Sequence, residues 1–322
     1  MDKIQRTLIT VCVVITVVLQ HGCITVNLVE PPGPVQEVQL SGSGDGKVLL
    51  LDLSGVISSQ DQDGFMPQPN VLATFKEELT KASKDEKVKA LVVRINSPGG
   101  TVNASDILYH ELKTFKANKK IPVVASMMDV AASGGYYLAM ATDNIFVHPS
   151  TVTGSIGVIM LTVNAKGLLE KVGVEANAIT SGPRKDMGSP FRTMTPEEKV
   201  IFQGVIDSFY DRFLTVVQEG RPRLSADQIK KLADGRIYSG AQAKDAGLVD
   251  NVGYLEEAIE LAKKNAGLTE ARIVTYRRRG EYQNNIYSQM FGSGAGLSKL
   301  ASMDLLSIVR GGSPQFMYLW MP

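Results

Sequence analysis

Residues 88–101, VKALVVRINSPGGT, decide the fold of this chain of 322 residues. Residues 90–93 are four consecutive apolar residues, a pattern typical of a strand in a parallel sheet that is covered on both faces. Gly99 and Gly100 follow the strand directly. Because glycine tolerates positive φ, such a turn can point backbone N–H groups into the crevice at the carboxyl end of a sheet. Taken alone, residues 96–101 indicate only a tight turn.

Strand and helix patterns alternate on both sides of this stretch. Alternation of this kind predicts an α/β fold with a mostly parallel sheet and flanking helices. We expect strands over 48–57, 88–95, 121–127, 144–148 and 176–180, and helices over 71–83, 104–119, 134–141 and 167–172.

From residue 195 onward the pattern is helical. Thr195 is an N-cap followed by Pro196 and two acidic residues, which predicts a helix of about 25 residues ending at Gly220. With shorter helices over 225–232, 239–245 and 254–266, we expect 195–266 to be a helical arm that packs on the sheet or on another subunit.

Residues 271–322 are expected to form a strand and a tail. The tail carries the apolar residues 316–320, which a monomer would leave exposed. A homo-oligomer would bury this segment and part of the arm, so we expect one.

The composition excludes several classes of protein. The 34 Lys+Arg and 33 Asp+Glu give a formal charge of +1, so no nucleic-acid partner is predicted. Cys12 and Cys23 both lie near the N-terminus, which excludes a cysteine nucleophile or a thiolate metal site in the folded body. His21, His110 and His148 are too few for a histidine metal site. We therefore expect neither a metal nor another cofactor.

The N-terminus has the features of an export signal. Lys3 and Arg6 precede an apolar run over 8–19 that continues to Val26. We expect 1–27 to be an uncleaved signal anchor or a lipoprotein signal with lipidation at Cys23, leaving the body outside the cytoplasm. Residues 28–46, rich in Pro, Gly and Ser, are expected to be a linker.

Two further loops carry side chains suited to catalysis. In residues 131–137, AASGGYY, Ser133 stands at a strand-to-helix turn, where the following N–H groups can donate to an oxyanion. In residues 181–190, SGPRKDMGSP, Lys185 lies in a glycine-containing loop. Taken singly, Ser133 is interpreted as a helix N-cap and Lys185 as a solvated lysine. Because histidine is nearly absent, lysine is the general base that remains for an activated serine. The lysine can act as a base only if burial lowers its pKa from about 10.4 by about 2 to 4.

Residues 47 to about 267 resemble the signal peptide peptidase A family of membrane-anchored serine proteases, short bacterial form, within the Clp-protease/crotonase superfamily. The resemblance rests on motifs in the same order and at compatible spacing. They are residues 95–100, 132–137, 153–157, 185–191, 235–240 and 246–250.

The resemblance implies a role for individual residues. Ser133 would be the nucleophile, Lys185 the general base, and the N–H groups of Gly100 and Gly134 the oxyanion hole. Ser155 is the candidate for orienting Lys185 through a hydrogen bond.

The resemblance also implies a setting for the reaction. It implies a peptidase domain over 47–270 with a Clp-protease/crotonase-like fold, on the periplasmic side of the bacterial cytoplasmic membrane. Members cleave membrane-borne remnants of signal peptides, often as ring-like homo-oligomers with grooves assembled across subunits. Because small residues flank Ser133, the cleft is expected to suit small or aliphatic side chains of an extended peptide.

Two alternatives belong to other functional classes. A crotonase-fold acyl-CoA enzyme would share the fold and the paired N–H groups, but it needs no export signal. A catalytically silent membrane scaffold would use Ser133 as a helix cap and Lys185 as a solvated charge.

Overall fold

The computed structural model describes residues 33–60, 70–278, 285–287 and 315–321. The chain divides into two units, Met1–Gly33 and Pro34–Pro322, and every helix and strand of the described residues belongs to the second unit. The predicted membrane segment 1–27 lies outside the described residues. Among the described residues, no helix combines the length and the apolar character required to cross a bilayer.

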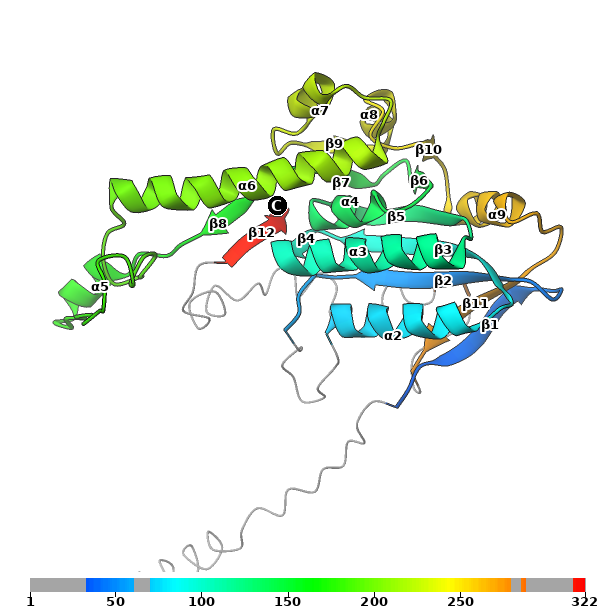
Figure 1. Ribbon diagram of the computed structural model, residues 1–322, viewed down its shortest axis with the longest axis horizontal. Coiled ribbons are helices and arrows are strands. Elements are labelled where there is room, and N and C mark those ends of the chain that lie inside the picture. Colours follow the sequence, from blue (N-terminus) through cyan, green and yellow to red (C-terminus); the bar gives the residue numbers. More distant parts are fainter. Residues whose placement is uncertain (1–32, 61–69, 279–284, 288–314, 322) are drawn as a thin grey trace, which may run out of the picture. The chain divides into compact units, whose positions relative to one another are not determined.

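The centre of the second unit is a mixed sheet. Its strands are β1 (Gln36–Gly42), β2 (Lys47–Ser54), β3 (Val88–Ser97), β5 (Val123–Ala132), β6 (Asn144–Val147), β7 (Val152–Gly154), β9 (Ile237–Ser239), β10 (Asn251–Val252) and β11 (Arg272–Arg277). Their order is β1-β11-β2-β3-β5-β6-β10 (Figure 1). In addition, β7 pairs with the C-terminal end of β5, and β9 pairs with β7. All these pairs are parallel except β1 with β11 and β7 with β9. The predicted, mostly parallel α/β architecture is confirmed.

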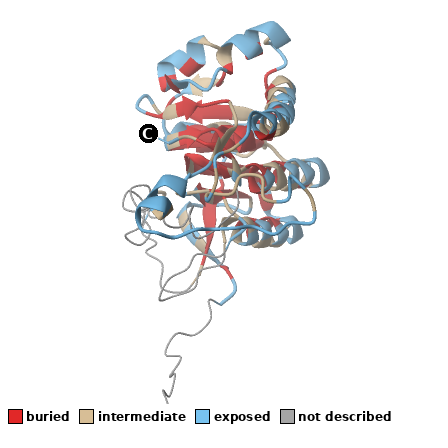
Figure 2. Cartoon of the chain, turned by 90° about the vertical axis from the view of Figure 1, so that its left-hand side faces the viewer, coloured by how far each residue is buried: buried red, intermediate tan, exposed pale blue. Residues whose placement is uncertain are grey.

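Helices cover both faces of this sheet. The helices are α2 (Val71–Lys84), α3 (Val102–Lys119), α4 (Gly134–Ala139), α6 (Pro196–Gly220), α7 (Ala226–Leu232), α8 (Gly240–Asp245) and α9 (Leu255–Asn265). Leu91 and Val93 of β3 belong to the core under α2, α3 and α4, whereas Ala90 and Val92 belong to the core under α9. Two covered faces therefore explain the continuous apolar run, and Figure 2 shows the buried residues concentrated in the strands.

The predicted 25-residue helix is α6, and its predicted N-cap, Thr195, forms a capping box with Glu198. The Thr195 hydroxyl accepts from the Glu198 N–H at 3.2 Å, and the Glu198 carboxylate accepts from the Thr195 N–H at 2.9 Å. Phe213 and Val217, near its C-terminal end, are fully buried, whereas Val200 near its start is 72% exposed. Only the C-terminal part of α6 therefore packs closely on the body.

A second, smaller sheet joins segments that are far apart in sequence. It consists of β4 (Gly99–Thr101), β12 (Gln315–Leu319) and β8 (Ile159–Leu161), with β12 in the middle and antiparallel to both neighbours. Met317, Tyr318 and Leu319 are buried. The expectation that a monomer leaves residues 316–320 exposed was therefore wrong, because these residues pair and pack within their own chain.

Two other local expectations differ from the structure. Residues 176–180, predicted as a strand, have no regular structure and pair with no described strand, and Ile179 is fully exposed; they follow α5 (Lys166–Lys171). Conversely, Gln36–Gly42 of the predicted linker forms β1, because β11 supplies an antiparallel partner. In both cases the neighbouring strand decides the outcome.

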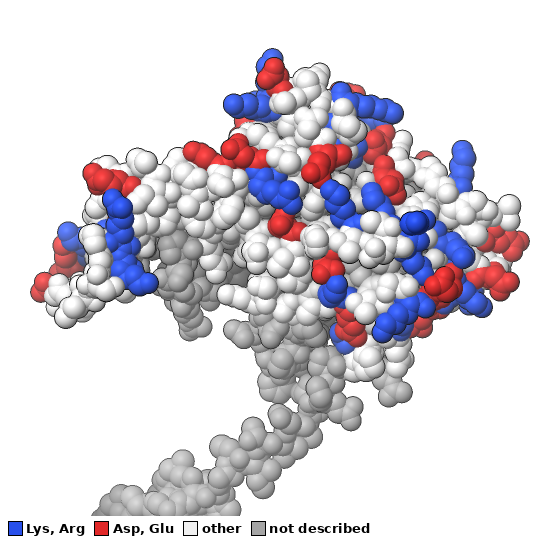
Figure 3. Space-filling model, viewed as in Figure 1, with Lys and Arg blue, Asp and Glu red and all other residues white. Residues whose placement is uncertain are grey.

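Charged side chains of both signs are interspersed on the face shown in Figure 3. Several form ion pairs, such as Arg212 with Asp106 at 2.9 Å and Lys116 with Asp143 at 3.1 Å. This mixture agrees with the formal charge of +1 and presents no field of one sign on that face.

Candidate active site

Ser133 occupies the sharp turn between β5 and α4. Its backbone has φ 52° and ψ −113°, and only two other non-glycine residues of the described segments, Lys120 and Ser155, have positive φ. The Ser133 N–H donates to the Gly154 carbonyl at 2.8 Å, and its carbonyl accepts from the Tyr137 N–H at 2.8 Å. The hydroxyl is buried and has no hydrogen-bond partner among the described residues. A strained backbone that holds an unpaired buried hydroxyl is typical of a nucleophile.

Gly99 and Gly100 bring β4 against the start of α4. The Thr101 N–H donates to the Ile57 carbonyl at 2.9 Å. Because polar groups alternate along a strand, the Gly100 N–H points to the opposite edge of β4. A Cβ on Gly99 would lie 2.6 Å from the Gly134 nitrogen, and one on Gly100 would lie 1.9 Å from the Ile57 oxygen. The two sequence-predicted oxyanion residues, Gly100 and Gly134, thus lie on closely packed backbones.

Ser155 lies beside Ser133. Gly154, which accepts the Ser133 N–H, pairs with Ala132 across β5 and β7, and Ser155 is the next residue. Its φ is 50°, its N–H donates to the Arg236 carbonyl at 2.8 Å, and its side chain is largely buried. Its hydroxyl makes no hydrogen bond to any residue that the structure describes, so it is free to orient another group near Ser133.

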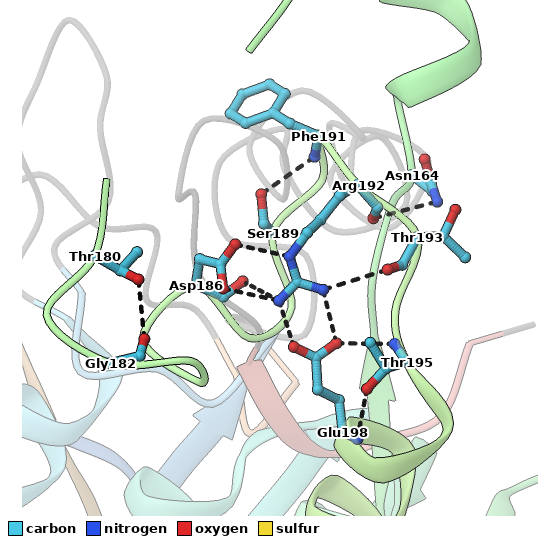
Figure 4. Close-up of polar contacts among 10 residues, drawn as sticks. All are labelled: Asn164, Thr180, Gly182, Asp186, Ser189, Phe191, Arg192, Thr193, Thr195 and Glu198. Atoms are coloured by element: carbon cyan, nitrogen blue, oxygen red, sulfur yellow. Dashed lines mark hydrogen bonds and ion pairs between the residues drawn. The ribbon is translucent and has the colours of Figure 1, made fainter. Parts of the chain in front are cut away.

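The segment carrying Lys185 is fastened to the start of α6 through Arg192, as Figure 4 shows. Arg192 donates to the two carboxylate oxygens of Asp186 at 2.7 and 2.8 Å, and to Glu198 at 2.9 Å. These hydrogen bonds hold the pKa of both carboxyls below their usual range. Since Arg192 already neutralises Asp186, the carboxylate next to Lys185 does not pair with it.

Lys185 itself is exposed. Its ammonium makes no hydrogen bond or ion pair with any described residue. Glu198 lies in the first turn of α6, and Phe213, fifteen residues later, packs on Tyr137 of α4 with ring centroids 5.0 Å apart. At 1.5 Å per residue, about 22 Å of helix separates these two positions. Figure 1 shows α5, which precedes the Lys185 segment, beyond the N-terminal end of α6 and away from α4.

The structure thus brings four of the five predicted site residues together and leaves one apart. The four are Ser133, Gly100, Gly134 and Ser155, and the fifth is Lys185.

The histidines do not supply a base for Ser133 in the described part of the chain. His148 follows β6 and packs on the Tyr254 ring at 5.4 Å; burial lowers its pKa, and its Nε2 is buried with no partner. His110 is exposed on α3. Neither makes a hydrogen bond to Ser133. His21 lies outside the described residues.

Sequence reasoning missed Arg192 as a residue that positions the Lys185 segment. The available signal was Glu198, one of the two acidic residues predicted in the first turn of α6, whose carboxylate accepts a hydrogen bond from Arg192 in the structure. It also missed the aromatic residues around Ser133. Tyr137, four residues after Ser133, stacks on Tyr318 of the C-terminal strand at 5.1 Å.

Two family models match the chain. The model of peptidase family S49 matches residues 115–269, and that of Clp protease matches residues 68–153. Among solved structures, a ClpP1 mutant from Listeria monocytogenes has a TM-score of 0.42 and 19% identity, covering 65% of this chain and 94% of its own.

Three curated proteins are similar over most of this chain. "Putative signal peptide peptidase SppA" of Enterococcus faecium is 39% identical over 243 residues, which are 75% of this chain and 70% of the relative. "Serine protease SPPA, chloroplastic" of Arabidopsis thaliana is 38% identical, over 73% of this chain and 35% of the relative. "Protease 4" of Salmonella typhi is 36% identical, over 68% of this chain and 35% of the relative.

Proposed function

This chain belongs to peptidase family S49 and is a serine protease, and we propose that Ser133 is its nucleophile and Lys185 its general base. The N–H groups of Gly100 and Gly134 form the oxyanion hole in this proposal. The observation that carries it is the Ser133 hydroxyl, buried without a described partner on a strained turn whose next residue, Gly134, packs against the glycine strand.

The chemistry proceeds through an acyl-enzyme. The neutral Lys185 amine takes the Ser133 proton while Oγ attacks the peptide carbonyl carbon, and the two backbone N–H groups donate to the oxyanion that forms. The Lys185 ammonium then returns the proton to the leaving amine as the C–N bond breaks. A water molecule, deprotonated by the same amine, hydrolyses the ester and restores Ser133. Ser155 orients the amine through its free hydroxyl.

In our proposal the Lys185 of one copy serves the Ser133 of a neighbouring copy. Support comes from the exposed, unpaired ammonium and from the length of α6 that separates Lys185 from Ser133 within one chain. A general base has to be neutral when it takes a proton, and contact with a neighbouring copy would remove the amine from the water that surrounds it in a single chain. Activity therefore requires a ring-like homo-oligomer.

The proposed substrates are remnant signal peptides left in the membrane after preproteins are processed. The enzyme would be held by residues 1–27, as an anchor or as a lipoprotein signal, with its catalytic unit on the periplasmic side of a bacterial membrane. The apolar run after Lys3 and Arg6, and the name of the Enterococcus relative, support this setting.

An active-site probe and a peptide assay test the proposal together. Ser133→Ala should abolish labelling by a fluorophosphonate, and Lys185→Ala should lower kcat by 10²–10⁴-fold. Ser181→Ala and Lys171→Ala, both at exposed positions near the arm, serve as matched controls and should retain activity. Retention of more than about a hundredth of the wild-type kcat by Lys185→Ala would exclude the dyad.

The substrate part has its own measurement. Mass spectrometry should detect fragments of a hydrophobic signal peptide after incubation with the wild-type chain and none with Ser133→Ala. Efficient cleavage of a folded globular protein, with signal peptides left intact, would contradict the proposed substrate class.

A further inference from the structure

We propose that Asn96 and Ser97, the last two residues of β3, position the catalytic groups of this enzyme. The Asn96 side chain fixes the end of β5 that carries Ser133, and the Ser97 hydroxyl fixes the turn that carries Gly100. Neither side chain touches the substrate, so both are positioning residues. The inference rests on the proposed function, because it takes Ser133 as the nucleophile and the Gly100 N–H as an oxyanion donor.

β5 changes its partner before it reaches the proposed nucleophile. The half that pairs with β6 ends at Met127, and the half that pairs with β7 begins at Val130. On the other side of β5, Ile95 of β3 lies opposite Met127, but Ser97 lies opposite Ala131. A step of two residues along β3 thus corresponds to a step of four along β5, which is a bulge in β5. A bulge bends its strand, so this one sets the direction of the half that carries the nucleophile.

Asn96 holds the bulge from the side of β3. Its Oδ1 accepts the Val130 N–H at 3.1 Å, at the place where the register of the two strands breaks. A side-chain oxygen therefore does there what a backbone carbonyl does along a regular ladder. The Asn96 carbonyl also accepts the Gly55 N–H at 3.0 Å, which fixes this residue to the segment after β2. Without the Asn96 side chain, the Val130 N–H would lose the acceptor that holds this end of β5 to β3.

Two threonine hydroxyls hold the bulge from the side of β7. Thr151 donates to the Met127 carbonyl at 3.1 Å, and Thr153 donates to the Ala131 carbonyl at 2.6 Å. Both threonine side chains are buried. The half of β5 after the bulge is therefore held from both sides, by the threonines and by Asn96.

Ser97 holds the glycine turn. Its hydroxyl donates to the Gly55 carbonyl at 2.6 Å and accepts the Gly99 N–H at 3.1 Å, and the residue is fully buried. Gly99 has a φ of 101°, and its carbonyl accepts the Ile57 N–H at 2.8 Å. One hydroxyl thus joins the segment after β2 to the turn whose next residue is Gly100.

The nucleophile and its oxyanion donor come from different loops, so their separation depends on both contacts. Successive side chains of a strand point to opposite faces, which lets two adjacent residues reach two loops. A misplacement of about 1 Å between reacting groups can lower the rate about 10²-fold. An extended substrate binds largely through its own main-chain contacts. Loss of either positioning contact should therefore lower kcat and leave KM nearly unchanged, whereas damage to substrate binding would raise KM.

The role of Asn96 is tested with one variant that keeps the acceptor and one that removes it. In the full-length chain, Asn96→Leu should lower kcat for a hydrophobic signal peptide about 10–100-fold with KM changed less than about threefold. Asn96→Asp retains an oxygen that can accept the Val130 N–H, so its kcat should stay within about threefold of wild type. Asn118→Leu, at an exposed position of α3, is the matched control and should behave as the wild type. A kcat of Asn96→Asp as low as that of Asn96→Leu would overturn the role of the acceptor.

The role of Ser97 is tested against an equally buried serine. Ser97→Ala should lower kcat about 10–100-fold with little change in KM. Ser126→Ala removes a fully buried hydroxyl of β5 whose contact is the Met128 sulfur at 3.9 Å, and its kcat should stay within about threefold of wild type. An equal loss in both variants would show that removal of any buried hydroxyl has this effect, and would overturn the role of Ser97.

The same assays separate this inference from the proposed function. Melting curves first have to show that each variant is folded at the assay temperature, and Asn96→Ala replaces Asn96→Leu if the latter is not. If the wild type hydrolyses the peptide, Ser133→Ala does not, and the folded variants at Asn96 and Ser97 keep kcat within about threefold, the positioning roles are wrong and the protease stands. If the wild type and Ser133→Ala are equally inactive, the proposed function fails and this inference fails with it.

Discussion

Replacing Gly100 by alanine places a methyl group directly against the backbone of Ile57. The new Cβ would lie 1.9 Å from the Ile57 oxygen, 2.5 Å from its carbonyl carbon and 2.6 Å from its nitrogen. Carbon atoms in ordinary contact are about 3.5–4.0 Å apart, so β4 and the Ile57 segment must separate by more than about 1 Å. Backbone atoms cannot rotate away as a side chain would. The Gly100 N–H therefore moves relative to Ser133.

This displacement should remove one oxyanion donor. Loss of a single donor lowers kcat by about 10²–10³-fold, and a misplacement of about 1 Å has a comparable effect. Overpacking should also destabilise the fold by about 1–3 kcal/mol, so hydrolysis of the signal peptide is measured well below the melting temperature of the variant.

Gly157→Ala is the matched control for this variant. Its Cβ would meet only the Gly235 Cα at 3.6 Å, an ordinary contact, although Gly157 lies two residues after Ser155. We expect a kcat close to that of the wild type. The melting curve of Gly100→Ala first has to show that the variant is folded at the assay temperature. A kcat of this folded variant within about tenfold of that of the wild type would refute the assignment of the Gly100 N–H to the oxyanion hole.

Three further predictions follow from other parts of the structure. Arg192→Gln should lower kcat/KM at least about tenfold by releasing the Lys185 segment, while the sheet and its covering helices stay folded, because Arg192 joins only this segment to the start of α6; an unchanged kcat/KM would contradict its positioning role. Burial lowers the pKa of His148, and the negative charges of Glu256 and Asp129 raise it by a smaller amount. The unfolded chain therefore binds a proton at His148 more readily than the folded chain does. Stability should therefore fall as pH decreases from about 6.5 through the lower native pKa, and His148→Phe should show a smaller fall in melting temperature over that window. Gly204→Ala, in α6 with no atom within 4 Å of the new Cβ, should stabilise the chain by about 0.5–1 kcal/mol in urea unfolding, and destabilisation would show that this surface is not open.

Local sequence patterns predicted the elements that are decided by nearby residues. The buried strand at Val88–Ser97 and the helix at Pro196–Gly220 have strong periodicity or strong caps, and both are present. The position of Ser133 at a strand-to-helix turn was also visible, because small residues end β5 and open α4.

Pairing between distant segments could not be predicted from these patterns. Gln36–Gly42 looks like a linker until β11 is placed beside it, and residues 176–180 look like a strand although they pair with no described strand. The tail is the clearest case, because only the edges of β4 and β8 explain why Tyr318 is buried. The number of residues between Ser133 and Lys185 likewise does not predict their distance, because that distance depends on the length of α6 between them in one chain.

A mixing experiment tests most directly whether Ser133 and Lys185 act together across copies. Ser133→Ala and Lys185→Ala chains, each inactive alone, are unfolded together in equal amounts, refolded and assayed for peptide hydrolysis. If each site takes Ser133 from one copy and Lys185 from the next, random assembly leaves about a quarter of the sites with both groups, and about a quarter of the wild-type activity should return. No recovery, under conditions in which a refolded wild-type sample is fully active, would contradict the shared site.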